Sequence, residues 1–216
     1  MEYLRKLFVP IEVPSLRRLN EGSKKNTAFT ILAILVSVAG PVFANTEGRP
    51  IDNAHSTMTV YVYKTGILSG LAHNHEIEAP IESGEVNNSE RPSVELRVNS
   101  GELRVLDPEV SDGTRAKIQA TMQSAEVLDV GQFPEIHFQS TGVEAGRTDH
   151  WVVYGNLDLH GQTHPISFEV ALKDGLYQGT AVLKQSGFGI TPVKIAGGTV
   201  KVKDEIKVVF SIALQR

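Results

Sequence analysis

Hydrophobic and polar residues alternate along most of the chain beyond residue 57. The clearest alternating runs are residues 58–63, 94–98, 136–140, 153–159, 166–172 and 206–214. Successive side chains of a β-strand point to opposite faces of a sheet, so each run predicts a strand with one apolar face. Glycine, asparagine and aspartate residues between the runs predict turns. The pattern therefore predicts many antiparallel strands joined by tight connections.

One segment has a helical period instead. Ile118, Met122 and Ala125 recur at the spacing of one helix face and predict a helix from about residue 114 to about residue 127. Pro134 prevents a longer helix, because proline lacks the N–H group that the helix interior needs. We expect an all-β fold with this one inserted helix. A closed barrel is favoured over a sandwich, because closure leaves no strand edge exposed.

The N-terminal residues resemble a targeting segment. Lys24 and Lys25 precede thirteen mostly apolar residues, and the small residues Val42 and Ala44 follow. This order predicts a signal peptide over residues 1–44, cleaved after Ala44. Thirteen helical residues rise about 20 Å, less than the roughly 30 Å of a bilayer core, so stable membrane insertion is not expected after cleavage. An uncleaved anchor is the alternative.

The remaining residues divide into a short linker, 45–50, and a single domain, 51–216. The stretch before Lys24 is long for a signal peptide and is compatible with a translation start downstream of Met1. Export predicts a periplasmic or secreted protein. The domain is expected to be a monomer or a homodimer.

Composition excludes several functions. The 216 residues contain no cysteine, which rules out disulfides, thiolate metal sites and cysteine nucleophiles. Without residues 1–44, the chain keeps 15 Lys and Arg residues against 22 Asp and Glu residues, a net charge of −7. Such an acidic domain is a poor binder of nucleic acid. No nucleophile elbow, phosphate-binding loop or metalloprotease motif occurs, so nothing in the sequence favours an enzyme.

Three stretches resemble the YceI family. Residues 127–141 read VLDVGQFPEIHFQST, residues 153–166 read VYGNLDLHGQTHPI, and FGITP at 188–192 precedes VKVKDEI at 200–206. Together they match the family's motifs in order, and the resemblance spans roughly residues 51–214. It implies an eight-stranded antiparallel barrel that is similar to the lipocalins. It also implies that the protein binds a polyisoprenoid or a quinone-like lipid in an apolar lumen outside the cytoplasm.

Strand parity predicts which apolar residues line that lumen, since an eight-stranded barrel has room inside for side chains or one slender ligand. The candidates are Val60, Val62, Leu96, Phe138, Leu157, Phe168, Ile190 and Phe210.

His73 and His75 are the candidates for polar chemistry. Residues two apart on a strand share a face, and this face continues through Ile77, Ala79 and Ile81. Both imidazoles are therefore expected in the barrel or at its rim. They could contact a lipid headgroup, bind a metal ion if a third ligand approaches, or be satisfied by backbone carbonyls and water.

Three functions remain open on these grounds. The first is an exported carrier or store of an amphiphilic lipid, which needs no cofactor. The second is a filled barrel with a metal site at His73 and His75. The third is a ligand-free envelope-stress or interaction module whose partner is another protein.

Overall fold

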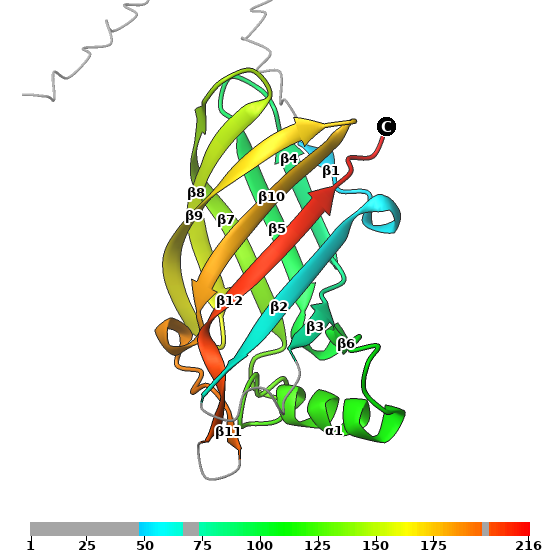
Figure 1. Cartoon of the computed structure of the whole chain (residues 1–216). Helices are drawn as coiled ribbons and strands as arrows, with labels where there is room; N and C mark the ends of the chain where they lie inside the picture. The colour runs from blue at the N-terminus through cyan, green and yellow to red at the C-terminus, as the bar shows by residue number, and fades with distance from the viewer. Residues whose placement is uncertain (1–47, 67–73, 196–198) are drawn as a thin grey trace, which may run out of the picture. The chain divides into compact units, whose positions relative to one another are not determined.

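The computed structural model describes residues 48–66, 74–195 and 199–216, which are mostly β-structure (Figure 1). The described strands are β1 (Arg49–Pro50), β2 (Thr57–Thr65), β3 (His75–Glu78), β4 (Ser83–Asn87), β5 (Ser93–Asn99), β6 (Arg104–Val105), β7 (Glu135–Ala145), β8 (His150–Leu159), β9 (Gln162–Lys173), β10 (Leu176–Lys184), β11 (Lys194–Ile195) and β12 (Val200–Ile212). The helices are α1 (Asp112–Gln123) and three short 3-10 turns, η1 (Asn53–His55), η3 (Ser100–Glu102) and η4 (Gln185–Phe188).

The strands form one curled antiparallel sheet in the order β1-β4-β5-β7-β8-β9-β10-β12-β2-β3-β6, with β11 beside β12. The end of the chain returns to the beginning of the sheet. Ile51 pairs with Leu214, and the Gln215 N–H donates to the Pro50 carbonyl at 2.9 Å. The predicted all-β barrel with one helix is confirmed. The count of eight strands is too low, largely because β1, β6 and β11 are pairings of only two residues each.

Two-residue turns join the long strands. His160 and Gly161 connect β8 to β9 with φ angles of 52° and 70°, and Asp174 and Gly175 connect β9 to β10 with φ angles of 53° and 80°. Two consecutive residues with positive φ give the turn whose twist matches that of the flanking strands. These turns set the register of the hairpins and thereby decide which side chains face inward.

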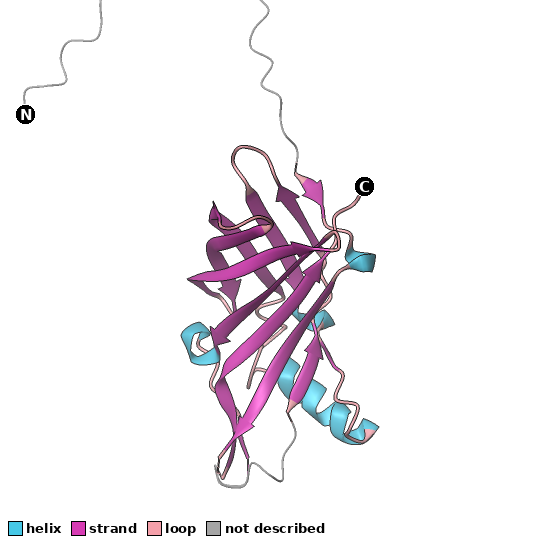
Figure 2. Ribbon diagram, turned by 45° about the horizontal axis from the view of Figure 1, so that its top comes forward, coloured by secondary structure: helices cyan, strands magenta, loops and turns pink. Residues whose placement is uncertain are grey.

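The helix α1 lies at one end of the barrel, beside β6 (Figures 1 and 2). It begins two residues earlier than predicted, where the Ser111 hydroxyl accepts the Thr114 N–H at 3.3 Å. It also ends four residues earlier, at Gln123. The Ser124 N–H bonds to the carbonyls of Ala120 and Thr121, and the following turns bring Leu128 against the core. The predicted end at about residue 127 is therefore wrong.

The predicted signal peptide, its cleavage after Ala44 and His73 lie outside the described residues. Within the described ranges, no helix has the length and apolar character that crossing a bilayer requires.

Candidate binding cavity

The barrel encloses a cavity of about 780 Å³. Its wall includes residues of nearly all the long strands. The structure places every one of the apolar lumen candidates around it: Val60, Val62, Leu96, Phe138, Leu157, Phe168, Ile190 and Phe210. A volume of this size falls within the roughly 300–1,000 Å³ of small-molecule sites. That these residues contact a ligand stays a prediction.

Inward-facing side chains show that the barrel is hollow. Val60, Val208 and Phe210 point into the cavity, yet each keeps enough accessible surface to be only half-buried. In a filled barrel, neighbouring side chains would cover such residues at close-packed density. The interior surface of this barrel is instead left in contact with open space.

A row of three phenylalanines crosses the wall of the cavity. The ring centroids of Phe138 and Phe168 are 5.3 Å apart, and those of Phe168 and Phe210 are 5.4 Å apart. Glycines on the strands between them provide the room. A Cβ on Gly155 would lie against the Phe138 ring, and a Cβ on Gly179 would lie against the Phe210 ring. The Phe138 and Phe210 rings therefore lie over glycines of neighbouring strands, where a larger residue would leave them no room.

His75 lines the cavity near α1, and Asp107 holds its ring. The antiparallel pairing of β3 with β6, followed by the hydrogen bond from the Leu106 N–H to the Glu76 carbonyl, brings the two residues together. His75 Nδ1 lies 2.6 Å from one Asp107 carboxylate oxygen, and the other oxygen accepts the Glu76 N–H at 2.8 Å. The Asp107 side chain is only 2% exposed, whereas that of His75 is 23% exposed. A carboxylate bonded to Nδ1 fixes the ring orientation and leaves Nε2 as its other polar atom.

The two ends of the cavity differ in charge. The end near α1 is lined by Tyr63, Lys64, His75, Thr114, Lys117, Thr121, Gln185 and Lys201. The far end is lined by uncharged residues, where the Asn88 amide donates to the Tyr177 hydroxyl at 2.8 Å and the Tyr177 ring packs on Trp151. Among the described residues that line the cavity, none is an aspartate or a glutamate.

His137 points out of the barrel, but its side chain is only 15% exposed. Its Nε2 lies 3.0 Å from Glu95 and its Nδ1 lies 3.6 Å from Asp158, on the two neighbouring strands. Hydrogen bonds from Arg97 and then from His137 lower the pKa of Glu95 below its ordinary value. These residues form an outer polar cluster that is separate from the cavity.

Two further histidines belong to the β8–β9 hairpin. His160 lies in the β8–β9 turn, where its Nδ1 is 3.1 Å from the Phe188 carbonyl oxygen. His164 packs edge-on against Phe188. In the part of the chain that the structure describes, no three His, Cys, Asp or Glu side chains come together as a metal site would require. Since His73 is not described, the metal alternative rests on His75 alone and stays a prediction.

Sequence reasoning missed Asp107. In the sequence, Asp107 followed by Pro108 indicates only that a helix begins shortly afterwards. Asp107 is 32 residues from His75, and only the β3–β6 pairing brings them together. Within the sequence, the one available signal was an acidic residue two positions beyond the short alternating stretch 103–105.

The model of the YceI-like domain family matches residues 50–214, which is most of the chain. The chain belongs to the YceI-like family. A UPF0312 protein of Vibrio campbellii is 29% identical over 150 residues, which cover 68% of this chain and 72% of the relative. Protein YceI of Salmonella arizonae is 34% identical over 96 residues, 43% of this chain and 44% of the relative. The barrel is also similar to that of BcnA from Burkholderia cenocepacia. That similarity has a TM-score of 0.59 at 15% identity and covers 75% of this chain and 98% of BcnA.

Proposed function

We propose that this YceI-like protein carries or stores a long-chain amphiphilic lipid, of the isoprenoid or quinone kind, in its barrel. The observation that supports this most is the hollow interior, whose inward-facing apolar side chains stay half-buried around about 780 Å³ of space. Burial of apolar surface contributes roughly 25 cal/mol per Å², so an extended hydrocarbon tail has a large driving force to enter. The interior of a small closed barrel suits a slender chain rather than a broad ring system.

The function proposed is binding rather than catalysis. An interior wall made almost entirely of aliphatic and aromatic side chains gives affinity for a tail, while a small number of polar groups at one end sets orientation. The proposal includes export, with residues 1–44 removed, so that the protein acts in the periplasm or after secretion. N-terminal sequencing of the protein recovered from the cell envelope tests that part.

Mass spectrometry of the protein purified from its own cells tests the ligand. Under native conditions we expect a mass increment that corresponds to one bound lipid, and solvent extraction of the same sample should release an isoprenoid or quinone. A protein without lipid that carries one transition-metal ion would favour the metal site instead. A protein with neither would contradict both and favour the interaction module.

A further inference from the structure

Charge around the cavity is one-sided. The protein as a whole has a net charge of −4, yet the charged side chains among the described cavity-lining residues are lysines: Lys64, Lys117 and Lys201. All three belong to the α1 end. Thr65 and Lys201 are paired residues of β2 and β12, and Lys117 is on α1. Binding of a neutral lipid does not require this excess of positive charge, whereas an anionic group at this end would be attracted by it.

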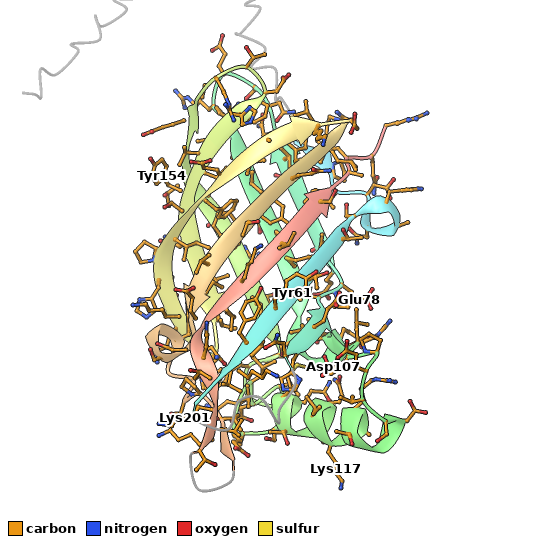
Figure 3. The ribbon with its side chains drawn as sticks, in the orientation of Figure 1. Tyr61, Glu78, Asp107, Lys117, Tyr154 and Lys201 are labelled. Carbon is orange, nitrogen blue, oxygen red and sulfur yellow. The ribbon has the colours of Figure 1, made fainter. Side chains whose placement is uncertain are left out.

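The lysines lie at the rim rather than deep in the lumen. Figure 3 shows Lys117 and Lys201 at the α1 end of the barrel, both lower in the view than Asp107, with the Lys117 side chain extending downward from α1 and Tyr154 toward the other end. Both lysines are exposed. A lysine can lay its methylene stem along apolar surface while its amino group stays in water. Lys117 and Lys201 can therefore line the cavity and still present positive charge at its edge.

His75 supplies the fixed element that the flexible lysines lack. Asp107 is almost completely buried and holds Nδ1 at 2.6 Å, so the orientation of the ring is set before any ligand arrives. The pair lies in the wall of the cavity at the same end as the lysines. A buried carboxylate is costly to maintain. Here it accepts the Glu76 N–H and orients the one imidazole that the described cavity wall contains.

We propose that the α1 end of the cavity binds the anionic headgroup of the lipid, a phosphate or a carboxylate, with His75 in contact and Lys117 and Lys201 attracting it. Asp107 acts through His75 and is a positioning residue. The inference rests on the proposed function and narrows it from amphiphilic lipids in general to acidic ones. The tail then extends away from α1 along the phenylalanine row.

Two ligands with one tail separate the headgroup from the hydrocarbon. Geranylgeranyl monophosphate and geranylgeraniol are titrated into the full chain after bound lipid has been removed. We expect the phosphate to bind about tenfold more tightly than the alcohol, a difference that shrinks as salt is added because exposed charges are screened. Inorganic phosphate alone should compete weakly, since the tail provides most of the affinity.

Substitutions test which residues cause the preference for the phosphate over the alcohol. Lys117→Gln combined with Lys201→Gln should remove most of the preference for the phosphate and leave the affinity for the alcohol unchanged. Lys173→Gln combined with Lys207→Gln makes the same change in net charge at exposed lysines that do not line the cavity, and should leave the preference intact. His75→Gln should lower the preference further.

Asp107 requires a measurement that a loss of stability would not mimic. In Asp107→Asn we expect the ¹⁵N chemical shifts of the His75 ring to change together with a reduced phosphate preference, while geranylgeraniol still binds. Asp107→Glu should restore part of both. Unchanged ring shifts with an unchanged preference would exclude the positioning role.

The outcomes distinguish this inference from the proposed function. Equal affinity for the two ligands would overturn the headgroup site and leave lipid binding intact. An equal loss in both lysine pairs would also overturn it, because the preference would then come from overall charge. Binding of neither ligand would overturn the lipid-binding function itself.

Discussion

At the scale of single residues, the glycines beside the phenylalanine row provide the space that the rings occupy. A Cβ at Gly155 would lie 2.5 Å from the Gln139 carbonyl oxygen and against the Phe138 ring. We expect Gly155→Ala to lower the free energy of unfolding by about 1–3 kcal/mol, since overpacking forces side chains out of their preferred rotamers. Urea denaturation measures this. Gly142→Ala is the matched control, because a Cβ there meets no atom within 4 Å.

A second variant separates crowding from an effect on the unfolded chain. Phe138→Leu removes the ring that the new methyl group would strike. If crowding is the cause, Gly155→Ala should cost less in the Phe138→Leu background than alone. A loss of stability that is as large in Gly142→Ala would contradict the explanation.

Residue-level sequence reasoning succeeded where the period of a strand was sufficient. Ile77, Ala79 and Ile81 share a face as predicted, and all three are buried. It does not extend to the surroundings of His137, because the face of that residue is predictable but the carboxylates beside it are not. Glu95 and Asp158 reach His137 through cross-strand register, which depends on turns and bulges far from it in the chain.

At the scale of elements, α1 is attached to the barrel by side chains that form the hydrogen bonds a neighbouring strand would otherwise form. Gln119 accepts the Val105 N–H at 2.8 Å and donates to the Leu103 carbonyl at 2.7 Å. Gln123 donates to the Gly101 carbonyl at 2.8 Å. The edge of β6 is thus covered by glutamine amides of the helix. A helical wheel shows these glutamines as polar positions, but it does not show that their partners are backbone groups.

The attachment predicts a local effect of removing one amide. Gln119→Ala leaves the polar backbone groups of two buried residues, Leu103 and Val105, without these partners, at a cost of about 1–3 kcal/mol. We expect faster amide hydrogen exchange in α1 and β6 and unchanged exchange in the β8–β9 hairpin. Gln132→Ala, at an exposed turn position, is the control. Uniformly faster exchange through the barrel would show that the amide acts globally instead.

At the scale of the whole molecule, a hollow barrel and a filled one respond oppositely to an added ring. Val208→Phe places extra carbons into the cavity from β12. If the interior is hollow, the midpoint of thermal unfolding should stay unchanged while the affinity for geranylgeraniol falls about tenfold. If the core is packed, the substitution should instead lower the free energy of unfolding by about 1–3 kcal/mol. Calorimetry and ligand titration on one sample decide between them.

Val182→Phe provides the matched control for that variant. Val182 is 57% exposed on the outer face of β10, so the same enlargement there should change neither stability nor affinity. A loss of lipid affinity in Val182→Phe would mean that the substitution disturbs the barrel rather than the space within it.

The class of the fold was predictable because alternation, turns and one helical stretch all indicate the same architecture. The hollowness of the barrel was not. Parity assigns Val60 or Phe210 to the inner face, but the sequence does not say whether inner faces meet each other or surround space. That depends on the circumference that the strand pairings impose, and therefore on contacts such as Ile51 with Leu214 at opposite ends of the domain.

Trp151, which lines the cavity at the end far from α1, is the protein's single tryptophan. Its ring centroid lies 5.9 Å from that of Tyr177. The emission of an indole depends on whether water or hydrocarbon surrounds it. With a headgroup bound at the α1 end, a short tail would leave this indole in contact with water, and a long tail would cover it. The fluorescence emission of Trp151 therefore reports how far along the lumen a bound chain extends.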